Sequence, residues 1–283
     1  MFRDGCMNAK EARLMAVRQR RGLTRTRGHR LLLCLGVVFM VLTCCAASAQ
    51  GALEPTRLVD SPTAGLIDKG RFALDLRLFP DGGVLTQINA GVMRRLSIGL
   101  SYGGVNVVGD DAIDWHPRVE VAARYRVIEE STGLPAITAG YETQGYGPFE
   151  GDVRYEIKSK GFFIAGSKNY MSEFGQFGVH GGVNWSRERE DGDENLSGWI
   201  GVDKTINEEL AVVGEYDFAF NDNDATSLGS GKGYLNAGAY WSAVPNISVG
   251  FVFKNVLGNG NSDVSGPDPD MSRELSVRYS EEF

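Results

Sequence analysis

Cysteine and histidine are scarce in this chain. The four cysteines all lie in the first 49 residues, and they are Cys6, Cys34, Cys44 and Cys45. Disulfide bonds and cysteine-bound metal sites are therefore excluded from the 234 residues that follow. Beyond residue 49 only His116 and His180 remain, which leaves little material for a Ser-His-acid catalytic site. We expect neither an enzyme nor a bound metal or cofactor.

Long apolar runs are also missing, with one exception near the start. Residues 31–45 are apolar, but this run is shorter than the roughly 20 residues that a membrane-spanning helix needs. It follows an arginine-rich stretch and precedes Ala47-Ser48-Ala49, a small-x-small cleavage pattern. The pattern predicts a secretory signal peptide over residues 1–49 that is cleaved after Ala49.

The exported chain is acidic and rich in glycine. Residues 1–49 carry nine Lys/Arg and two Asp/Glu, so their removal takes the net charge from −7 to −14. Such a charge repels nucleic acid, which excludes that class of partner. The 37 glycines suit many tight turns and crowded strands. If this part of the chain enters a membrane, it must do so as a closed β-barrel, because it has no apolar run of spanning length.

Apolar and polar residues alternate along most of the remaining chain, as in GRFALDLRLF (70–79) and RVEVAARYRV (118–127). This period of two is typical of strands with one oily and one polar face. Twelve strands are predicted, near 70–79, 84–94, 96–103, 118–128, 134–143, 160–170, 176–186, 197–206, 210–220, 234–243, 246–256 and 273–283. The facing of strand 160–170 stays open, because Phe162 and Phe163 are adjacent.

The connections between these strands alternate between short and long, except that the first long link is replaced by the short PDGG (80–83). Transmembrane barrels have short periplasmic turns and longer outer loops in this order. We therefore predict an all-β, antiparallel transmembrane β-barrel of about twelve strands over residues 70–283. Residues 50–69 are expected to stay in the periplasm or to enter the lumen as a plug. A soluble, secreted β-sandwich or barrel with its oily face inward is the alternative.

Aromatic residues fall at the strand ends, where membrane interfaces attract them. The predicted girdle residues are Tyr102, Tyr141, Trp185, Phe220, Phe253, Tyr170, Trp241 and Phe283. The last strand, with Leu275, Val277, Tyr279 and the terminal Phe283, resembles the C-terminal recognition signal of Gram-negative outer-membrane barrel proteins, although Glu281 departs from it. The resemblance implies an outer-membrane location, with membrane lipid and the barrel-insertion machinery as partners.

Charged residues share the opposite phase of the strands, where they can pair inside a barrel. The predicted lumen residues are Arg71, Asp75, Arg77, Glu120, Arg124, Arg126, Glu142, His180, Asp203, Glu215, Asp217, Glu274 and Arg278. Twelve strands enclose more space than eight, which side chains fill, and less than sixteen, which leave a wide channel. The lumen is therefore expected to be narrow and polar.

The stretch SPTAG, at residues 61–65, resembles the start of the YjbH-like group of exopolysaccharide-associated outer-membrane proteins. That resemblance implies a role with envelope polysaccharide and no catalytic residues. The sequence as a whole favours a small polar-solute channel or an envelope-assembly component. Two alternatives remain open: a surface-loop binding or adhesion barrel with a blocked lumen, and a barrel-embedded hydrolase centred on His180.

Overall fold

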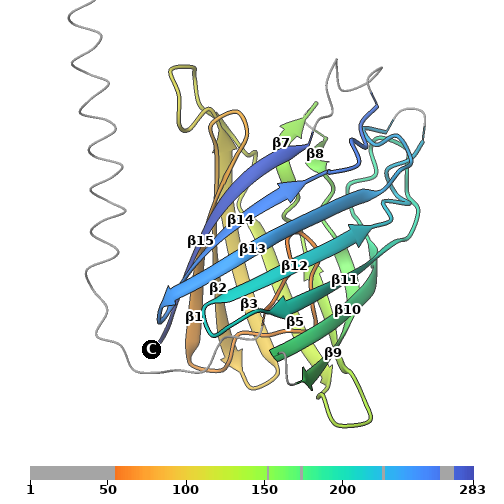
Figure 1. Cartoon of the computed structure of the whole chain (residues 1–283). Helices are drawn as coiled ribbons and strands as arrows, with labels where there is room; N and C mark the ends of the chain where they lie inside the picture. The colour runs from red at the N-terminus through yellow and green to blue at the C-terminus, as the bar shows by residue number, and fades with distance from the viewer. Residues whose placement is uncertain (1–54, 152, 173–174, 225–226, 262–270) are drawn as a thin grey trace, which may run out of the picture. The chain divides into compact units, whose positions relative to one another are not determined.

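Twelve long strands pair in one antiparallel sheet that closes on itself (Figure 1). The computed structural model describes residues 55–151, 153–172, 175–224, 227–261 and 271–283. The barrel strands are β1 (Arg71–Phe79), β2 (Gly83–Met93), β3 (Leu96–Val105), β5 (Glu120–Ile128), β6 (Ala136–Glu142), β9 (Gly161–Ser172), β10 (Gly175–Trp185), β11 (Ser197–Thr205), β12 (Leu210–Asp217), β13 (Tyr234–Val244), β14 (Ile247–Lys254) and β15 (Ser272–Glu282). The predicted all-β, antiparallel twelve-strand barrel is confirmed. The predicted signal peptide lies outside the described residues.

The first and last barrel strands close the sheet. Strand β1 pairs with β2 on one side and with β15 on the other, in a register that places Asp75 opposite Arg278 and Leu76 opposite Val277. Closure leaves no unpaired sheet edge among these twelve strands, as a sheet surrounded by lipid requires.

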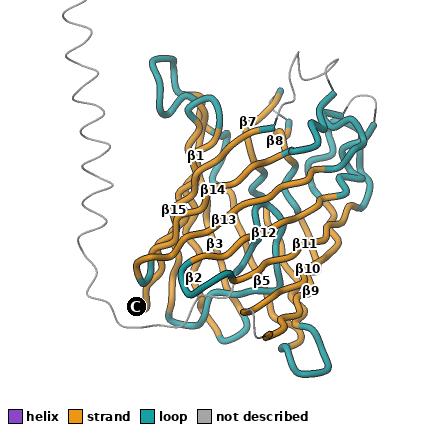
Figure 2. The backbone as a smooth tube through the Cα atoms, in the orientation of Figure 1, coloured by secondary structure: helices purple, strands orange, loops and turns teal. Residues whose placement is uncertain are grey.

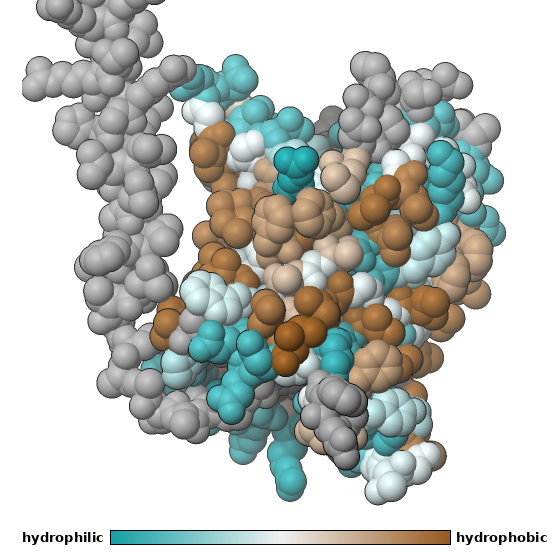
Figure 3. Space-filling model, viewed as in Figure 1, coloured by the Kyte–Doolittle hydropathy of each residue, from teal (hydrophilic) through white to brown (hydrophobic). Residues whose placement is uncertain are grey.

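Polar side chains face the inside of this barrel and apolar ones the outside. On β5, Glu120, Arg124 and Arg126 are buried, whereas Val121 and Tyr125 between them are exposed. A water-soluble barrel would bury the apolar set instead. Figure 3 shows hydrophobic residues over the middle of the wall on the side in view, with more hydrophilic residues toward its two ends. This is the surface pattern of a transmembrane barrel.

The strand whose facing the sequence left open now has a clear phase. Phe163, Ala165 and Ser167 of β9 are buried inside, whereas Phe162 and Ile164 are exposed on the outer wall. Phe163 lies edge-on to Trp199 of β11, at a ring-centroid distance of 6.3 Å. Two aromatic rings therefore occupy part of the lumen.

The two ends of the barrel differ in their connections (Figure 2). At one end short turns join the strands, including residues 94–95 between β2 and β3, and 245–246 between β13 and β14. We call this the short-turn end. The other, long-loop end carries the three short strands that the sequence did not predict, namely β4 (Asp114–Trp115), β7 (Tyr146–Glu150) and β8 (Arg154–Ile157). The β7–β8 hairpin was missed because it lies within a long predicted loop.

One link at the long-loop end is tight. Residues 80–82 connect β1 to β2, and Asp81 and Gly82 have φ values of 58° and 62°. Positive φ at both central positions is typical of a two-residue turn whose twist matches that of the flanking strands. The short link that interrupted the predicted alternation of loop lengths is thus a hairpin turn. No helix long and apolar enough to cross a membrane occurs in the part of the chain that the structure describes.

We expect Leu100→Arg to destabilise the barrel in lipid. Leu100 is 53% exposed at mid-strand and pairs with exposed Ile88 and Val121 on its two neighbours. Arginine on the lipid face near the midplane costs about 2–4 kcal/mol. The protein in lipid vesicles is heated to a series of temperatures and run on a gel without boiling. The temperature at which the folded band gives way to the unfolded band should be lower for Leu100→Arg, and Leu100→Val serves as the control. Equal conversion temperatures for the two variants would contradict an outer wall in contact with hydrocarbon.

Candidate functional site: a polar lumen occupied by residues 55–69

Residues 55–69, here called the lumen segment, run inside the barrel and precede β1 (Figure 1, orange). Ten consecutive residues of this segment, from position 58 to 67, are buried. Leu58 and Val59 are 1% and 0% exposed although they lie outside any strand. Leu58 fits against Gly201 of β11, where a Cβ atom would come within 2.3 Å of a Leu58 methyl group. The wall is therefore shaped to receive the segment.

A single carboxylate holds the turn at the middle of the segment. Glu215 of β12 accepts hydrogen bonds from the backbone N–H groups of Val59, Asp60 and Ser61, each at 2.9 Å. The Asn236 amide donates to the same carboxylate at 2.8 Å. Successive backbone N–H groups that point at one anion form a nest, and hydrogen bonds to an ionised acceptor are about twice as strong as neutral ones. Glu215 thus fixes the segment through its backbone.

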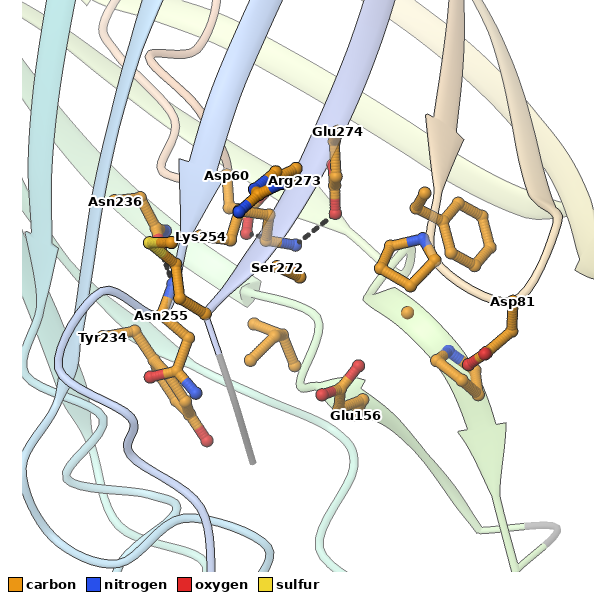
Figure 4. Close-up of a pocket in the computed structure, with 16 residues that line it drawn as sticks. Asp60, Asp81, Glu156, Tyr234, Asn236, Lys254, Asn255, Ser272, Arg273 and Glu274 are labelled. Carbon is orange, nitrogen blue, oxygen red and sulfur yellow. Dashed lines mark hydrogen bonds and ion pairs between the residues drawn. The ribbon is translucent and has the colours of Figure 1, made fainter. Parts of the chain in front are cut away.

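Asp60 of the segment completes a closed ring of four ionised side chains, here called the ion ring. Arg77 of β1 lies 2.6 Å from Asp60 and 3.3 Å from Glu274 of β15. Lys254 of β14 lies 2.9 Å from Asp60 and 3.0 Å from Glu274. Each charge contacts two of opposite sign, which compensates for their removal from water. Figure 4 shows Lys254 between the two carboxylates.

Arginine side chains hold the two ends of the segment. Arg57 donates to Gln87 at 2.9 Å and to Glu142 at 2.8 Å. Near the other end, Arg126 donates to the Ala64 carbonyl at 3.1 Å. Since both ends and the middle are bonded to different strands, the segment is held along its length.

Ser167, His180 and Asp203 form a hydrogen-bonded chain across β9, β10 and β11. Ser167 Oγ lies 2.8 Å from His180 Nδ1, and His180 Nε2 lies 2.6 Å from Asp203. These residue types match those of a catalytic triad, but Ser167 Oγ accepts the backbone N–H of Ala64 at 2.8 Å and the residue is 2% exposed. The arrangement therefore holds the segment rather than presenting a free nucleophile. The sequence missed Ser167 because its pairing with His180 depends on strand register.

The β7–β8 hairpin fills part of the lumen toward the long-loop end and borders a cavity there. Tyr146 of β7 is buried, and its phenol accepts a hydrogen bond from Arg57. The Arg77 guanidinium and the Lys254 ammonium lie 4.4 and 5.0 Å from the centre of its ring, within cation–π range. Tyr155 of β8 is fully buried and donates to Glu120 at 3.1 Å. The hairpin thus meets both the wall and the lumen segment.

Two cavities approach the segment from opposite ends. One, of about 490 Å³, lies toward the long-loop end and is lined by Asp60, Lys254 and Glu274, among others (Figure 4). The other, of about 750 Å³, includes the short turns in its lining and reaches Arg57 and Arg77. No residue lines both cavities. The ion ring and Arg57 therefore lie at the boundary between the two cavities.

The predicted lumen residues lie on the inner wall, and the girdle residues face outward. The buried members of the lumen set are Arg71, Arg77, Glu120, Arg124, Arg126, Glu142, His180, Asp203, Glu215, Asp217 and Glu274. Asp75 and Arg278 are half-buried and 2.5 Å apart. Of the girdle set, Tyr141 is half-buried and the exposed residues are Tyr102, Trp185, Phe220, Phe253, Tyr170, Trp241 and Phe283. Among the described residues, no group of three or more His, Cys, Asp or Glu could hold a metal ion.

Comparison with known proteins finds no matching family model and no matching curated protein, so the expected link to the YjbH-like group has no support there. Among solved structures, the chain is similar to a "KdgM porin", with 10% identity, 75% of this chain and 99% of that chain covered, and a TM-score of 0.47. It is also similar to a "KdgM porin in complex with disordered oligogalacturonate", with 12% identity, 75% of this chain and 99% of that chain covered, and a TM-score of 0.48. For the outer membrane channel DcaP of Acinetobacter baumannii, the identity is 8%, the alignment covers 75% of this chain and 95% of that chain, and the TM-score is 0.31.

Replacing Glu215 by Gln should loosen the lumen segment. A glutamine offers one acceptor oxygen and turns an amide toward backbone donors, so the N–H groups of residues 59–61 lose charge-assisted bonds. Hydrogen exchange of the backbone amides of residues 58–61 should accelerate at least about tenfold. Tyr240→Phe, which removes one bond to the Leu58 carbonyl, is the matched control with a smaller expected effect. Unchanged exchange in the Gln variant would show that Glu215 does not hold the segment.

Glu188, in the loop after β10, should make the long-loop end sensitive to pH. Burial raises the pKa of Glu188 from 4.5 to about 7, although the carboxyl accepts the N–H groups of Tyr155 and Ser159. A raised pKa in the folded state means that the stabilisation is complete below 4.5 and is lost as the pH rises through about 7. Glu188→Gln should flatten the change in unfolding temperature over this range. The same slope in both proteins would assign it to another group.

Proposed function

We propose that this chain is an outer-membrane channel for polar solutes, closed in the present conformation by the lumen segment. The observation that carries the proposal is the pair of cavities, each with charged residues in its lining, that enter from opposite ends and reach the same segment. A barrel that served only as a surface platform would not need a vestibule at each end. The closed sheet with an oily outer wall supports the location, because such barrels occur in outer membranes.

The segment that closes the path has the chemistry of a removable plug. It is bound through hydrogen bonds and ion pairs, such as those of Glu215 and Arg77, rather than as a strand of the barrel sheet. Water or a solute that enters the lumen can take over these hydrogen bonds when the segment leaves. The barrel ladder does not depend on it. We therefore assign opening to displacement of the segment toward the short-turn end, where β1 begins.

Related assignments follow from this proposal. The short-turn end faces the periplasm and the long-loop end faces the outside, as the lengths of the connections favour. The C-terminal strand β15, which ends at Glu282 just before Phe283, is the segment that the insertion machinery would recognise. Export would follow cleavage after Ala49. Envelope polysaccharide is one class of polar solute that such a channel could carry.

Deleting residues 55–69 should open the channel. The full-length protein in a planar bilayer is expected to show little conductance, and the deletion variant should show steady ion currents, because the two cavities would then join. A synthetic peptide of residues 55–69 added on the short-turn side should block these currents again, whereas a peptide of scrambled order should not.

If the deletion variant folds, as shown by a faster-migrating unboiled gel band, yet conducts no more than the full-length protein, the channel is rejected. That outcome would favour the alternative of a surface-binding barrel with a blocked lumen.

A further inference from the structure

The ion ring contains one member that does not belong to the barrel wall. Arg77, Lys254 and Glu274 lie on β1, β14 and β15, whereas Asp60 lies on the lumen segment. The side chains of Arg77, Asp60, Lys254 and Glu274 are only 11%, 4%, 6% and 3% exposed. The segment thus places its own carboxylate between two buried cations of the wall.

Displacement of the segment would leave these cations short of negative charge. Arg77 would lose both Asp60 and the Val59 carbonyl, to which its Nη2 donates a hydrogen bond at 2.7 Å. Lys254 would lose Asp60 as well. Among the described residues, Glu274 would then be the one carboxylate in an ion pair with both cations, beside the Tyr146 ring. A buried charge that loses its partner is costly. The emptied position therefore favours the binding of another anion.

Other charged residues of the wall near the segment would keep a partner after its displacement. Glu142 would lose Arg57 but keep Arg124, whose guanidinium lies 3.0 Å from it. Glu215 would lose three backbone donors but keep the Asn236 amide. The deficit of negative charge is consequently centred on Arg77 and Lys254 and not spread along the lumen.

A solute can approach this position from the long-loop end. Lys254, Glu274 and Asp60 line the cavity of about 490 Å³, and Figure 4 shows the three side chains converging in it. A water molecule takes about 30 Å³ in the liquid, so the cavity has room for a small carboxylate with part of its hydration shell. A carboxylate also matches the group that occupies the ring, since it accepts from a guanidinium and an ammonium at once.

We infer that Asp60 is an internal competitor for an anion site formed by Arg77 and Lys254. A carboxylate-bearing solute that enters from the long-loop end takes the place of Asp60 and thereby favours release of the lumen segment. A ligand that binds only the released state shifts the equilibrium toward that state. The inference rests on the proposed channel function, and it adds the solute chemistry that opens the path.

The test measures exposure of the segment with Ser61→Cys. Ser61 is fully buried, and all four native cysteines lie within residues 1–45, so modification is quantified on the peptide that contains residue 61. The protein in lipid vesicles is treated with N-ethylmaleimide in sodium acetate or in sodium chloride of equal ionic strength. The labelling rate in acetate should be about tenfold higher than in chloride. This is the size of effect expected when the acetate carboxylate takes over one charge-assisted contact of Asp60.

Two further variants locate the effect. With Asp60→Asn in the Ser61→Cys background, labelling should be fast in chloride and acetate should add nothing, because the internal competitor is gone. With Lys254→Gln, the ratio of the acetate rate to the chloride rate should fall close to one, because half of the anion site is gone. Equal rates in acetate and chloride for Ser61→Cys alone, or an undiminished acetate effect in either further variant, would overturn the inference.

Conductance of the variant that lacks residues 55–69 separates this inference from the channel itself. Currents through that variant, together with no acetate effect on labelling, would reject the anion site and keep the channel. An acetate effect without currents would keep the anion site and reject the channel.

Discussion

Polar groups inside a closed barrel must find partners among themselves, and in this chain the lumen segment supplies many of those partners. Its backbone N–H groups meet Glu215, its carbonyl groups meet Arg77 and Arg126, and the Asp60 carboxylate lies between two cations. Without the segment the wall would present these charges to water or to a solute. The polar lining and the segment are therefore complementary surfaces, and the closed state depends on that complementarity.

Much of the barrel could be predicted from the sequence, because the alternation of side chains is a local property. Glu120, Arg124 and Arg126 share one phase of a strand, and that phase alone separates them from Val121 and Tyr125 on the other face. The even number of strands and the unequal loops follow from the same pattern. Even the strand with adjacent Phe162 and Phe163 was placed correctly, although its facing required its neighbours.

The arrangement inside the lumen could not be predicted, because it depends on pairings between distant parts of the chain. Ser167 meets His180 only through the register of β9 with β10, and Asp60 meets Lys254 across almost 200 residues. Backbone donors that face Glu215 leave no signature in residue type, since any residue carries an N–H group except proline. The β7–β8 hairpin lies in a stretch with Gly147 and Pro148, whose composition is that of a loop.

The position of the ion ring has a consequence for assembly. Arg77 and Glu274 lie on β1 and β15, the two strands that meet where the barrel closes, and Asp60 and Lys254 complete their contacts. Contacts between the two ends of a chain form late, because so much loop entropy opposes them. In a barrel whose strands β1 and β15 have not yet paired, Arg77 would lack its contact with Glu274. Lateral closure, which pairs β1 with β15, therefore also brings Arg77 to Glu274 and completes the ion ring.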